Sequence, residues 1–398
     1  MERISKRLAG LEESATLAIT AKAKALVAEG RDIIGFGAGE PDFDTPENIK
    51  EAAVRAIREG QTKYTPVGGI PELKAAVMEK FSVDNGLEYS PGEVLVSCGG
   101  KHSLYNLFQA VIDPGDEVIV PAPYWVSYPP MVELAGGTAR VVSTGEENGF
   151  KMTPEELKAA VTARTRAVVI NSPSNPTGAA YTSAELAGLA EAALSAGLLI
   201  VSDEIYERLT YDGFESTSVA SVSDEVRRST VVFNGVSKTY SMTGWRIGYA
   251  AGPAPIIKAM TKIQSQSTSN PCSISQWAAL EALTGPQDAV GKMLAEFSLR
   301  RAAIVDGLNS IEGVRCFHPR GAFYVFPDVS GLYGRKVGGK VIEGSVDITG
   351  YLLEEAGVAV VPGAPFGEDS GIRLSYATSL EKVTEGVERI RKAAERLA

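Results

Sequence analysis

The sequence predicts an α/β protein in which helices flank a mostly parallel β-sheet and a second, smaller α/β domain follows. Three observations support this prediction. Apolar segments of strand length are nearly continuous rather than alternating, as in strands covered on both faces. Helical periodicity falls between several of these segments, which is the α/β arrangement. Beyond about residue 290 the pattern changes to a long helix, short strands and a final helix.

Five apolar runs are predicted as strands of the sheet, and five periodic segments as helices. The strands are expected at residues 94–97, 117–120, 167–170, 198–201 and 231–233. The helices are expected at residues 49–59, 71–81, 183–196, 291–309 and 383–397. Polar or aromatic segments follow each strand, namely 98–102, 121–125, 171–178, 203–206 and 237–238. Because the carboxyl ends of parallel strands meet at one edge, we expect these segments to form one site.

Length, composition and charge restrict the classes of protein to consider. The chain has 398 residues, of which 44% are hydrophobic and 22% charged, so two globular domains are expected. The formal net charge of -10 argues against a nucleic-acid-binding protein, which normally presents a basic face. No apolar stretch is long enough to span a membrane, and the N-terminus lacks the apolar core of a signal peptide. We therefore expect a cytoplasmic protein without a nucleic-acid or membrane partner.

The cysteines and histidines predict no metal site. Cys98, Cys272 and Cys316 lie far apart without metal-ligand spacing, and they suggest a reducing compartment. His102 and His318 are too few for a multi-histidine site. Neither histidine is assigned a catalytic role.

Lys238 gives the clearest chemical prediction. It lies between an apolar strand and the apolar segment 245–249, so we expect a partly buried amine. Burial lowers the pKa of a lysine and makes its free amine available for Schiff-base chemistry. Arg246 and the hydroxyl groups between the two residues would suit a phosphate. An amine beside a phosphate site suggests pyridoxal 5′-phosphate as the cofactor.

Other residues at the strand ends are open to two interpretations. The pair Gly99–Gly100 is either a plain turn or a source of backbone N–H groups for an anion. Asp203 either caps a helix or keeps a pyridine nitrogen protonated. Trp125 is either a core residue or a flat face that stacks on a ring. Arg373 has no acidic neighbour in its local run, which favours an external carboxylate over a buried ion pair.

Over nearly its whole length the sequence resembles the fold-type I, class I pyridoxal-phosphate aminotransferases, within them the bacterial aspartate aminotransferase subgroup Ib. The motifs that carry the resemblance are residues 37–43, 63–65, 175–178, 203–206, 237–238 and 244–249. The resemblance implies a large cofactor domain, residues 47–290, with a seven-stranded sheet. It implies a small domain made of residues 1–46 and 291–398.

The resemblance also implies a role for each motif residue. Lys238 would bond to the cofactor and then transfer the substrate's proton, and Asp203 would pair with the pyridine nitrogen. Tyr206 and Asn175 would contact the ring oxygen, and Trp125 would stack on the ring. The phosphate would be held by Gly100, Lys101, Ser237 and Arg246, with Tyr64 of the neighbouring subunit of a homodimer. The substrate would be bound by Gly39, Asn175 and Arg373 at its α-carboxylate, with Trp125, Lys101 and Thr16 nearby.

Substrate choice is expected to depend on two of these positions. The resemblance favours transfer of the amino group from L-aspartate to 2-oxoglutarate by a ping-pong mechanism, giving oxaloacetate and L-glutamate. Lys101 would receive the distal carboxylate, although it could also be a solvated lysine at a helix start. Together with Thr16 it is associated in subgroup Ib with conversion of prephenate to arogenate.

Two alternative classes remain at this stage. The same scaffold hosts alanine, kynurenine and aromatic aminotransferases and carbon–sulfur lyases, which the cofactor motifs do not exclude. A transcription regulator with an aminotransferase-like domain would need an additional N-terminal DNA-binding domain. The likeness begins by about Ile4, so we expect no such domain.

Overall fold

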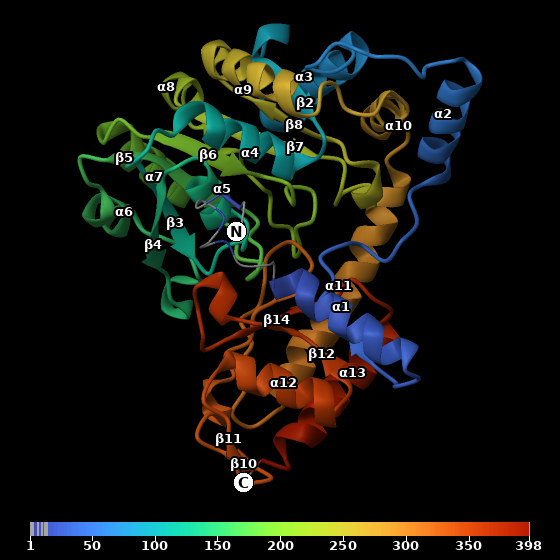
Figure 1. Ribbon diagram of the computed structural model, residues 1–398, viewed down its shortest axis with the longest axis vertical. Coiled ribbons are helices and arrows are strands. Elements are labelled where there is room, and N and C mark those ends of the chain that lie inside the picture. Colours follow the sequence, from blue (N-terminus) through green and yellow to red (C-terminus); the bar gives the residue numbers. More distant parts are fainter. Residues whose placement is uncertain (1–3, 6–7, 9–10, 12–14, 398) are drawn as a thin grey trace.

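A seven-stranded sheet organises the larger part of the molecule, in the upper half of Figure 1. The computed structural model describes residues 4–5, 8, 11 and 15–397. The strands are β2 (Val94–Ser97), β3 (Glu117–Ala122), β4 (Thr138–Ser143), β5 (Thr165–Asn171), β6 (Leu199–Asp203), β7 (Thr230–Gly235) and β8 (Gly248–Ala251). Their order is β2-β8-β7-β6-β5-β3-β4, and β8 runs antiparallel to both neighbours while the other pairs are parallel. The mostly parallel sheet is therefore confirmed.

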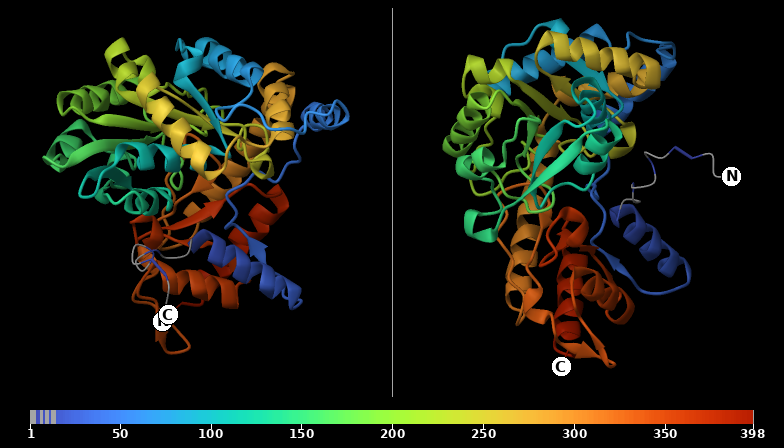
Figure 2. Two further views of the ribbon diagram at one scale, coloured as in Figure 1. Left: turned by 45° about the horizontal axis from the view of Figure 1, so that its top comes forward. Right: turned by 60° about the vertical axis from the view of Figure 1, so that its left-hand side comes forward.

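Helices cover both faces of this sheet, which explains the continuous apolar runs (Figures 1 and 2). Val118 and Val120 of β3 pack in one hydrophobic cluster, whereas Ile119 packs in another on the opposite face. The first face is covered by α4 (Gly100–Val111), α5 (Tyr128–Leu134) and α9 (Ala254–Ser267). The second is covered by α3 (Pro71–Asn85), α6 (Pro154–Ala160), α7 (Ser183–Ser195), α8 (Asp224–Arg228) and α10 (Ser273–Thr284), with α2 (Glu47–Arg58) against α10.

Both ends of the chain contribute to the smaller part of the structure. β1 (Ile34–Gly35) pairs in parallel with β12 (Val358–Ala359), and Phe36 is fully buried in the same core. The other elements are α1 (Ala15–Ala28), α11 (Asp288–Asn309), β9 (Tyr324–Val325), β10 (Lys336–Val337), β11 (Lys340–Val341), α12 (Ser345–Glu355), β13 (Val361–Pro362), β14 (Ile372–Ser375) and α13 (Leu380–Ala394). β13, β14 and β9 form an antiparallel sheet. Within the described residues, no helix combines the length and apolar character of a membrane span.

The pairing of β1 with β12 supports the predicted small domain, residues 1–46 with 291–398, and the seven-stranded sheet lies within the predicted large domain, residues 47–290. We keep this division as a proposal. Helix α11 begins at Asp288, so the proposed boundary falls within the first turn of that helix.

Local sequence signals account for where several helices begin and end. Pro71 occupies the first position of α3, and Gly86 ends it in the left-handed conformation with φ of 65°. Thr182 and Glu185 form a reciprocal capping box at the start of α7. The five predicted helices correspond to α2, α3, α7, α11 and α13, with ends shifted by a few residues.

Two strands of the main sheet lack a signal in the sequence. β4 is an edge strand in which no residue is buried, so it shows no long apolar run. β8 is buried, but it consists of Gly, Tyr and two Ala, which are weakly apolar as a group. Their places in the sheet depend on pairing with other strands, β3 for β4, and β7 and the distant β2 for β8.

Candidate active site

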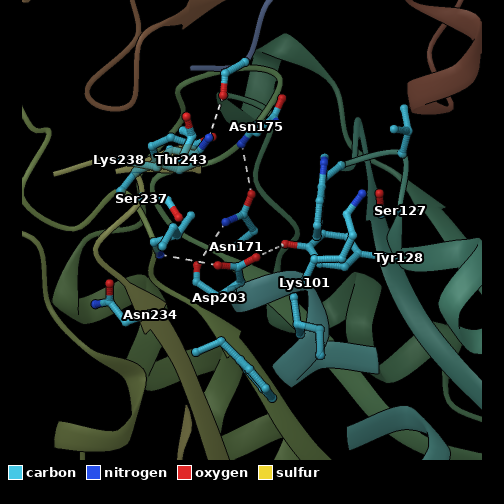
Figure 3. A pocket seen from close by; sticks show the side chains of 18 of the residues that line it. Lys101, Ser127, Tyr128, Asn171, Asn175, Asp203, Asn234, Ser237, Lys238 and Thr243 are labelled. Carbon is cyan, nitrogen blue, oxygen red and sulfur yellow. Dashed lines mark hydrogen bonds between the residues drawn. The ribbon is translucent and has the colours of Figure 1, made fainter. Parts of the chain in front are cut away.

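A cavity of about 300 Å³ lies at the carboxyl ends of the parallel strands (Figure 3). Loops after β2, β3, β5, β6 and β7 line it, and strand β14 adds one arginine. The predicted residues that line it are Gly39, Gly100, Lys101, Trp125, Asn175, Asp203, Tyr206, Ser237, Lys238, Arg246 and Arg373. The structure thus brings together residues separated by more than 300 positions in the chain.

Lys238 follows the end of β7, and its Nζ donates a hydrogen bond of 2.5 Å to the backbone oxygen of Gly39. Desolvation lowers the pKa of this amine to about 8, and the positive charges of Arg246 and Arg373 act in the same direction. The carboxylates of Glu40 and Asp203 oppose that change. A lower pKa leaves more neutral amine near neutral pH, and the neutral amine is the form that attacks a carbonyl carbon.

Asp203 is the last residue of β6, and its side chain is buried in the cavity wall. Burial raises the pKa of this carboxyl to about 6, although the hydrogen bond from Tyr128 lowers it. The Tyr128 O–H donates to Oδ2 over 2.6 Å, and the Ile205 N–H donates to Oδ1 over 3.3 Å. A protonated pyridine nitrogen beside this carboxylate would replace part of the lost hydration. Asp203 therefore fits the expected ring-nitrogen partner.

The start of α4 and Arg246 form a cradle suited to a phosphate. Gly99 precedes the helix with φ of 92°, and a Cβ atom there would lie only 2.4 Å from Nη2 of Arg246. The N–H groups of the first helical turn lack partners within the helix and attract anions. Nη1 of Arg246 donates to the backbone oxygen of Thr243 over 2.7 Å, which fixes the guanidinium beside the helix start. Ser237 adds a hydroxyl to the cavity lining.

Arg373 lies in β14 with only 2% of its surface exposed. Nη1 donates to Oδ1 of Asn175 over 3.1 Å and Nη2 to the backbone oxygen of Gly37 over 2.7 Å, whereas the buried Nε has no partner within the described residues. Burial lowers the pKa of the guanidinium. A buried cation bonded only to neutral oxygens in the part of the chain that is described requires an anion. This supports the predicted external carboxylate over a buried ion pair.

Lys101 and Trp125 lie together at the cavity. Nζ of Lys101 is 4.9 Å from the centroid of the Trp125 ring, a cation–π distance. Desolvation and the charge of Arg246 lower the pKa of Lys101, yet the residue remains exposed. Its ammonium can therefore receive an anion that enters the cavity.

Two predicted site residues, Tyr64 and Thr16, are not placed in the cavity by the described side chains. Tyr64 is 92% exposed and is absent from the cavity lining. Its expected contact with a neighbouring subunit stays a prediction. Thr16 belongs to α1, but its side chain lies outside the described residues.

Two tyrosines in the site were not found from the sequence. Tyr128 bonds Asp203, and the O–H of Tyr324 lies 2.9 Å from that of Tyr206. A Cβ atom at Gly39 would approach the Tyr324 oxygen to 3.0 Å, so the glycine lets the N-terminal segment lie close to this pair. Tyr128 sits in an aromatic segment and Tyr324 in a short strand, where nothing local distinguishes a site residue from a core residue.

Within the described ranges, no group of three or more metal-ligating side chains is found. Instead, an amine of low pKa, a buried carboxylate, a phosphate cradle and a buried arginine share one cavity. These groups fit the expected pyridoxal 5′-phosphate.

Gly248 provides a test of the cradle. A Cβ atom at this position of β8 would lie 2.2 Å from the backbone nitrogen of Gly100, so Gly248→Ala should displace the start of α4. We expect at least a ~10-fold weaker affinity for pyridoxal 5′-phosphate, measured by fluorescence titration. Gly92→Ala is the control, because its new methyl group meets open space. Equal affinity of the two variants would contradict the assignment.

Comparison with known proteins agrees with the fold and site. The family model described as "Aminotransferase class I and II" matches residues 31–390. An aspartate aminotransferase of Geobacillus stearothermophilus is 55% identical over 393 residues, covering 99% of both chains. An aspartate/prephenate aminotransferase of Cereibacter sphaeroides is 56% identical over 392 residues, covering 98% of both. The crystal structure of the aspartate aminotransferase from Rhizobium meliloti superposes with a TM-score of 0.97 at 47% identity over all of both chains. The chain belongs to the class I and II aminotransferase family.

Proposed function

We propose that the chain is a pyridoxal-phosphate-dependent aminotransferase that transfers the amino group of L-aspartate to 2-oxoglutarate. One observation carries the proposal: the half-buried Lys238 amine, the buried Asp203 carboxylate and the buried Arg373 guanidinium line the same cavity. This arrangement provides a nucleophilic amine, a partner for a ring nitrogen and a receptor for a carboxylate. The family match and the full-length aspartate aminotransferase relatives support it.

Each residue then has a physical task. When bound, pyridoxal 5′-phosphate supplies an electrophilic carbonyl carbon and a conjugated ring that accepts the electron pair of the breaking Cα–H bond. Asp203 holds the proton on the ring nitrogen and so keeps the ring electron-poor. Arg246 and the start of α4 bind the phosphate, while Trp125 covers the ring. Tyr206 and Asn175 contact the ring oxygen.

Arg373 and Lys238 act on the substrate. Arg373 binds the α-carboxylate, assisted by Asn175 and the backbone of Gly39, and so orients the Cα–H bond. Lys238 would take the Cα proton as a general base and return it to the cofactor carbon that was the aldehyde carbon. Hydrolysis would then release oxaloacetate and leave the amino group on the cofactor. The same steps in reverse would pass that amino group to 2-oxoglutarate and give L-glutamate.

We further propose a homodimer in which Tyr64 of one subunit reaches the phosphate of the other. The 92% exposure of this aromatic ring supports the idea, because such a ring on the surface is suited to a subunit interface. We also propose a cytoplasmic location. The three cysteines form no disulfide, as is usual for proteins of a reducing compartment.

Prephenate is proposed as a second amino acceptor. It carries a ring carboxylate in addition to its 2-oxo acid group, so it presents a second anion, as aspartate does. Lys101 at the cavity is a suitable receptor, and a relative at 56% identity is named for both activities. Thr16 is proposed to assist Lys101.

The absorption spectrum tests the central proposal. Adding L-aspartate to the protein loaded with pyridoxal 5′-phosphate should replace the long-wavelength cofactor band with that of pyridoxamine phosphate, with oxaloacetate in equal amount. 2-Oxoglutarate should restore the first band. Lys238→Ala should abolish both changes, because it removes the proposed general base, whereas Lys258→Ala, at an exposed position of α9, should not. Ammonia in place of L-glutamate would indicate a lyase, and conversion with alanine or kynurenine but not aspartate would indicate another specificity.

Lys101→Ala tests the choice of substrate. Loss of the ammonium should lower kcat/KM for aspartate and for prephenate by ~10- to 100-fold, as expected for one charged hydrogen bond, while alanine is affected far less. Lys258→Ala again serves as the surface control. Arogenate is the product to measure with prephenate and an amino donor. Equal losses for aspartate and alanine would rule out the distal-carboxylate role, and no arogenate from the unmodified enzyme would rule out the second activity.

A further inference from the structure

Tyr128 makes the shortest side-chain contact to Asp203. Its O–H donates to Oδ2 over 2.6 Å, and Figure 3 shows the two side chains pointing toward each other. Tyr128 is 1% exposed and Asp203 6% exposed. A hydrogen bond to an ionised group is strong, and it is stronger still between buried groups than in water.

The packing around Tyr128 fixes the direction of its hydroxyl. The residue begins α5, and its ring meets the Trp125 ring edge to face with centroids 5.3 Å apart. It belongs to the hydrophobic cluster under α4, α5 and α9. Burial and the nearby Asp203 raise the pKa of Tyr128 well above its ordinary value, so the hydroxyl keeps its proton and acts as a donor.

Three titratable groups face Asp203, each from a different element. Tyr128 approaches from α5, Tyr206 from the turn after β6, and Lys238 from the loop after β7. Tyr206 is already bonded to Tyr324, and Lys238 to the oxygen of Gly39. Within the described residues, Tyr128 is therefore the side chain that donates a hydrogen bond to the Asp203 carboxylate.

We propose that Tyr128 is a positioning residue for Asp203, holding Oδ2 so that the carboxylate stays ionised and presents Oδ1 to the ring nitrogen of the cofactor. Oδ1 receives only the longer bond from the Ile205 N–H within the described chain, so it has capacity for a further donor. This inference rests on the proposed function, because it needs a pyridine ring in the cavity. Tyr128 itself touches neither substrate nor cofactor in this role.

The consequence is a defined dependence on pH. Without the Tyr128 hydroxyl the Asp203 carboxylate loses a donor, so its pKa rises above the value of about 6 that burial already imposes. Affinity for a ring that carries a proton on nitrogen is present above that pKa and is lost as the pH falls through it. Removing the hydroxyl should therefore move this loss of affinity to higher pH.

Pyridoxamine 5′-phosphate is the probe, because it has the ring and phosphate of the cofactor but no aldehyde to bond Lys238. Its Kd is measured by fluorescence titration between pH 5 and 8.5 on the cofactor-free protein and on Tyr128→Phe. We expect Tyr128→Phe to bind ~10-fold more weakly at pH 7 and the midpoint of the pH dependence to rise by ~1 unit. Tyr181→Phe is the matched control, because it removes another buried tyrosine hydroxyl, one bonded to the Met152 N–H outside the cavity.

Asp203→Asn separates positioning from a merely structural role. In that background no carboxylate remains to be held, so adding Tyr128→Phe should cause no further loss of affinity. An unchanged pH midpoint in Tyr128→Phe, or the same loss in both backgrounds, would overturn the inference while leaving the proposed function intact. Failure of the unmodified protein to bind pyridoxamine phosphate at any pH would overturn both.

Discussion

The site depends on charges that are held together in a place largely closed to water. Burial raises the pKa of Asp203 and lowers the pKa values of Lys238 and Arg373. In all three residues it therefore favours the neutral form. Their mutual interactions partly offset that cost, since Asp203 favours the charged form of Lys238. A ligand carboxylate would stabilise the charged form of Arg373, and a protonated ring nitrogen would stabilise the charged form of Asp203. Burying these charged groups costs free energy, and a bound amino acid and cofactor with the opposite charges reduce that cost. The cavity is therefore complementary in charge to both ligands.

Close backbone contacts make this cavity possible. Gly248 lets β8 lie against the start of α4, and Gly99 leaves room for the Arg246 guanidinium. Gly39 brings the N-terminal segment to Lys238 and Tyr324. The two parts of the molecule therefore meet at the cavity, where Arg373 from the C-terminal part bonds Asn175 from the larger sheet.

The sequence predicted those features that are local or shared with a family. Runs such as 117–120 and 167–170 are apolar on both faces because helices cover both sides, so the parallel sheet was predictable. The end of each run marked the cavity edge, and Lys238, Asp203 and Arg373 do line one cavity. Their individual roles, inferred from their places in the sequence and from the resemblance, stay proposals.

Features that depend on contacts between distant segments could not be read from the sequence. Edge strand β4 has no apolar run, and β8 is recognised only by its partners. In the sequence, nothing distinguishes Tyr128 from an aromatic core residue. Its contact with Asp203, 75 positions later at the end of β6, appears only in the folded chain. The contact of Tyr64 with a second subunit stays a prediction.

Attachment of the cofactor to Lys238 is the claim on which the account depends most. Borohydride reduction of the protein loaded with pyridoxal 5′-phosphate would fix the bond, and peptide mass spectrometry would locate it. The account predicts one phosphopyridoxyl group per chain, on the peptide that contains Lys238, because desolvation lowers the pKa of that amine to about 8 inside the cavity. Labelling spread over surface lysines, or confined to a lysine other than Lys238, would contradict it.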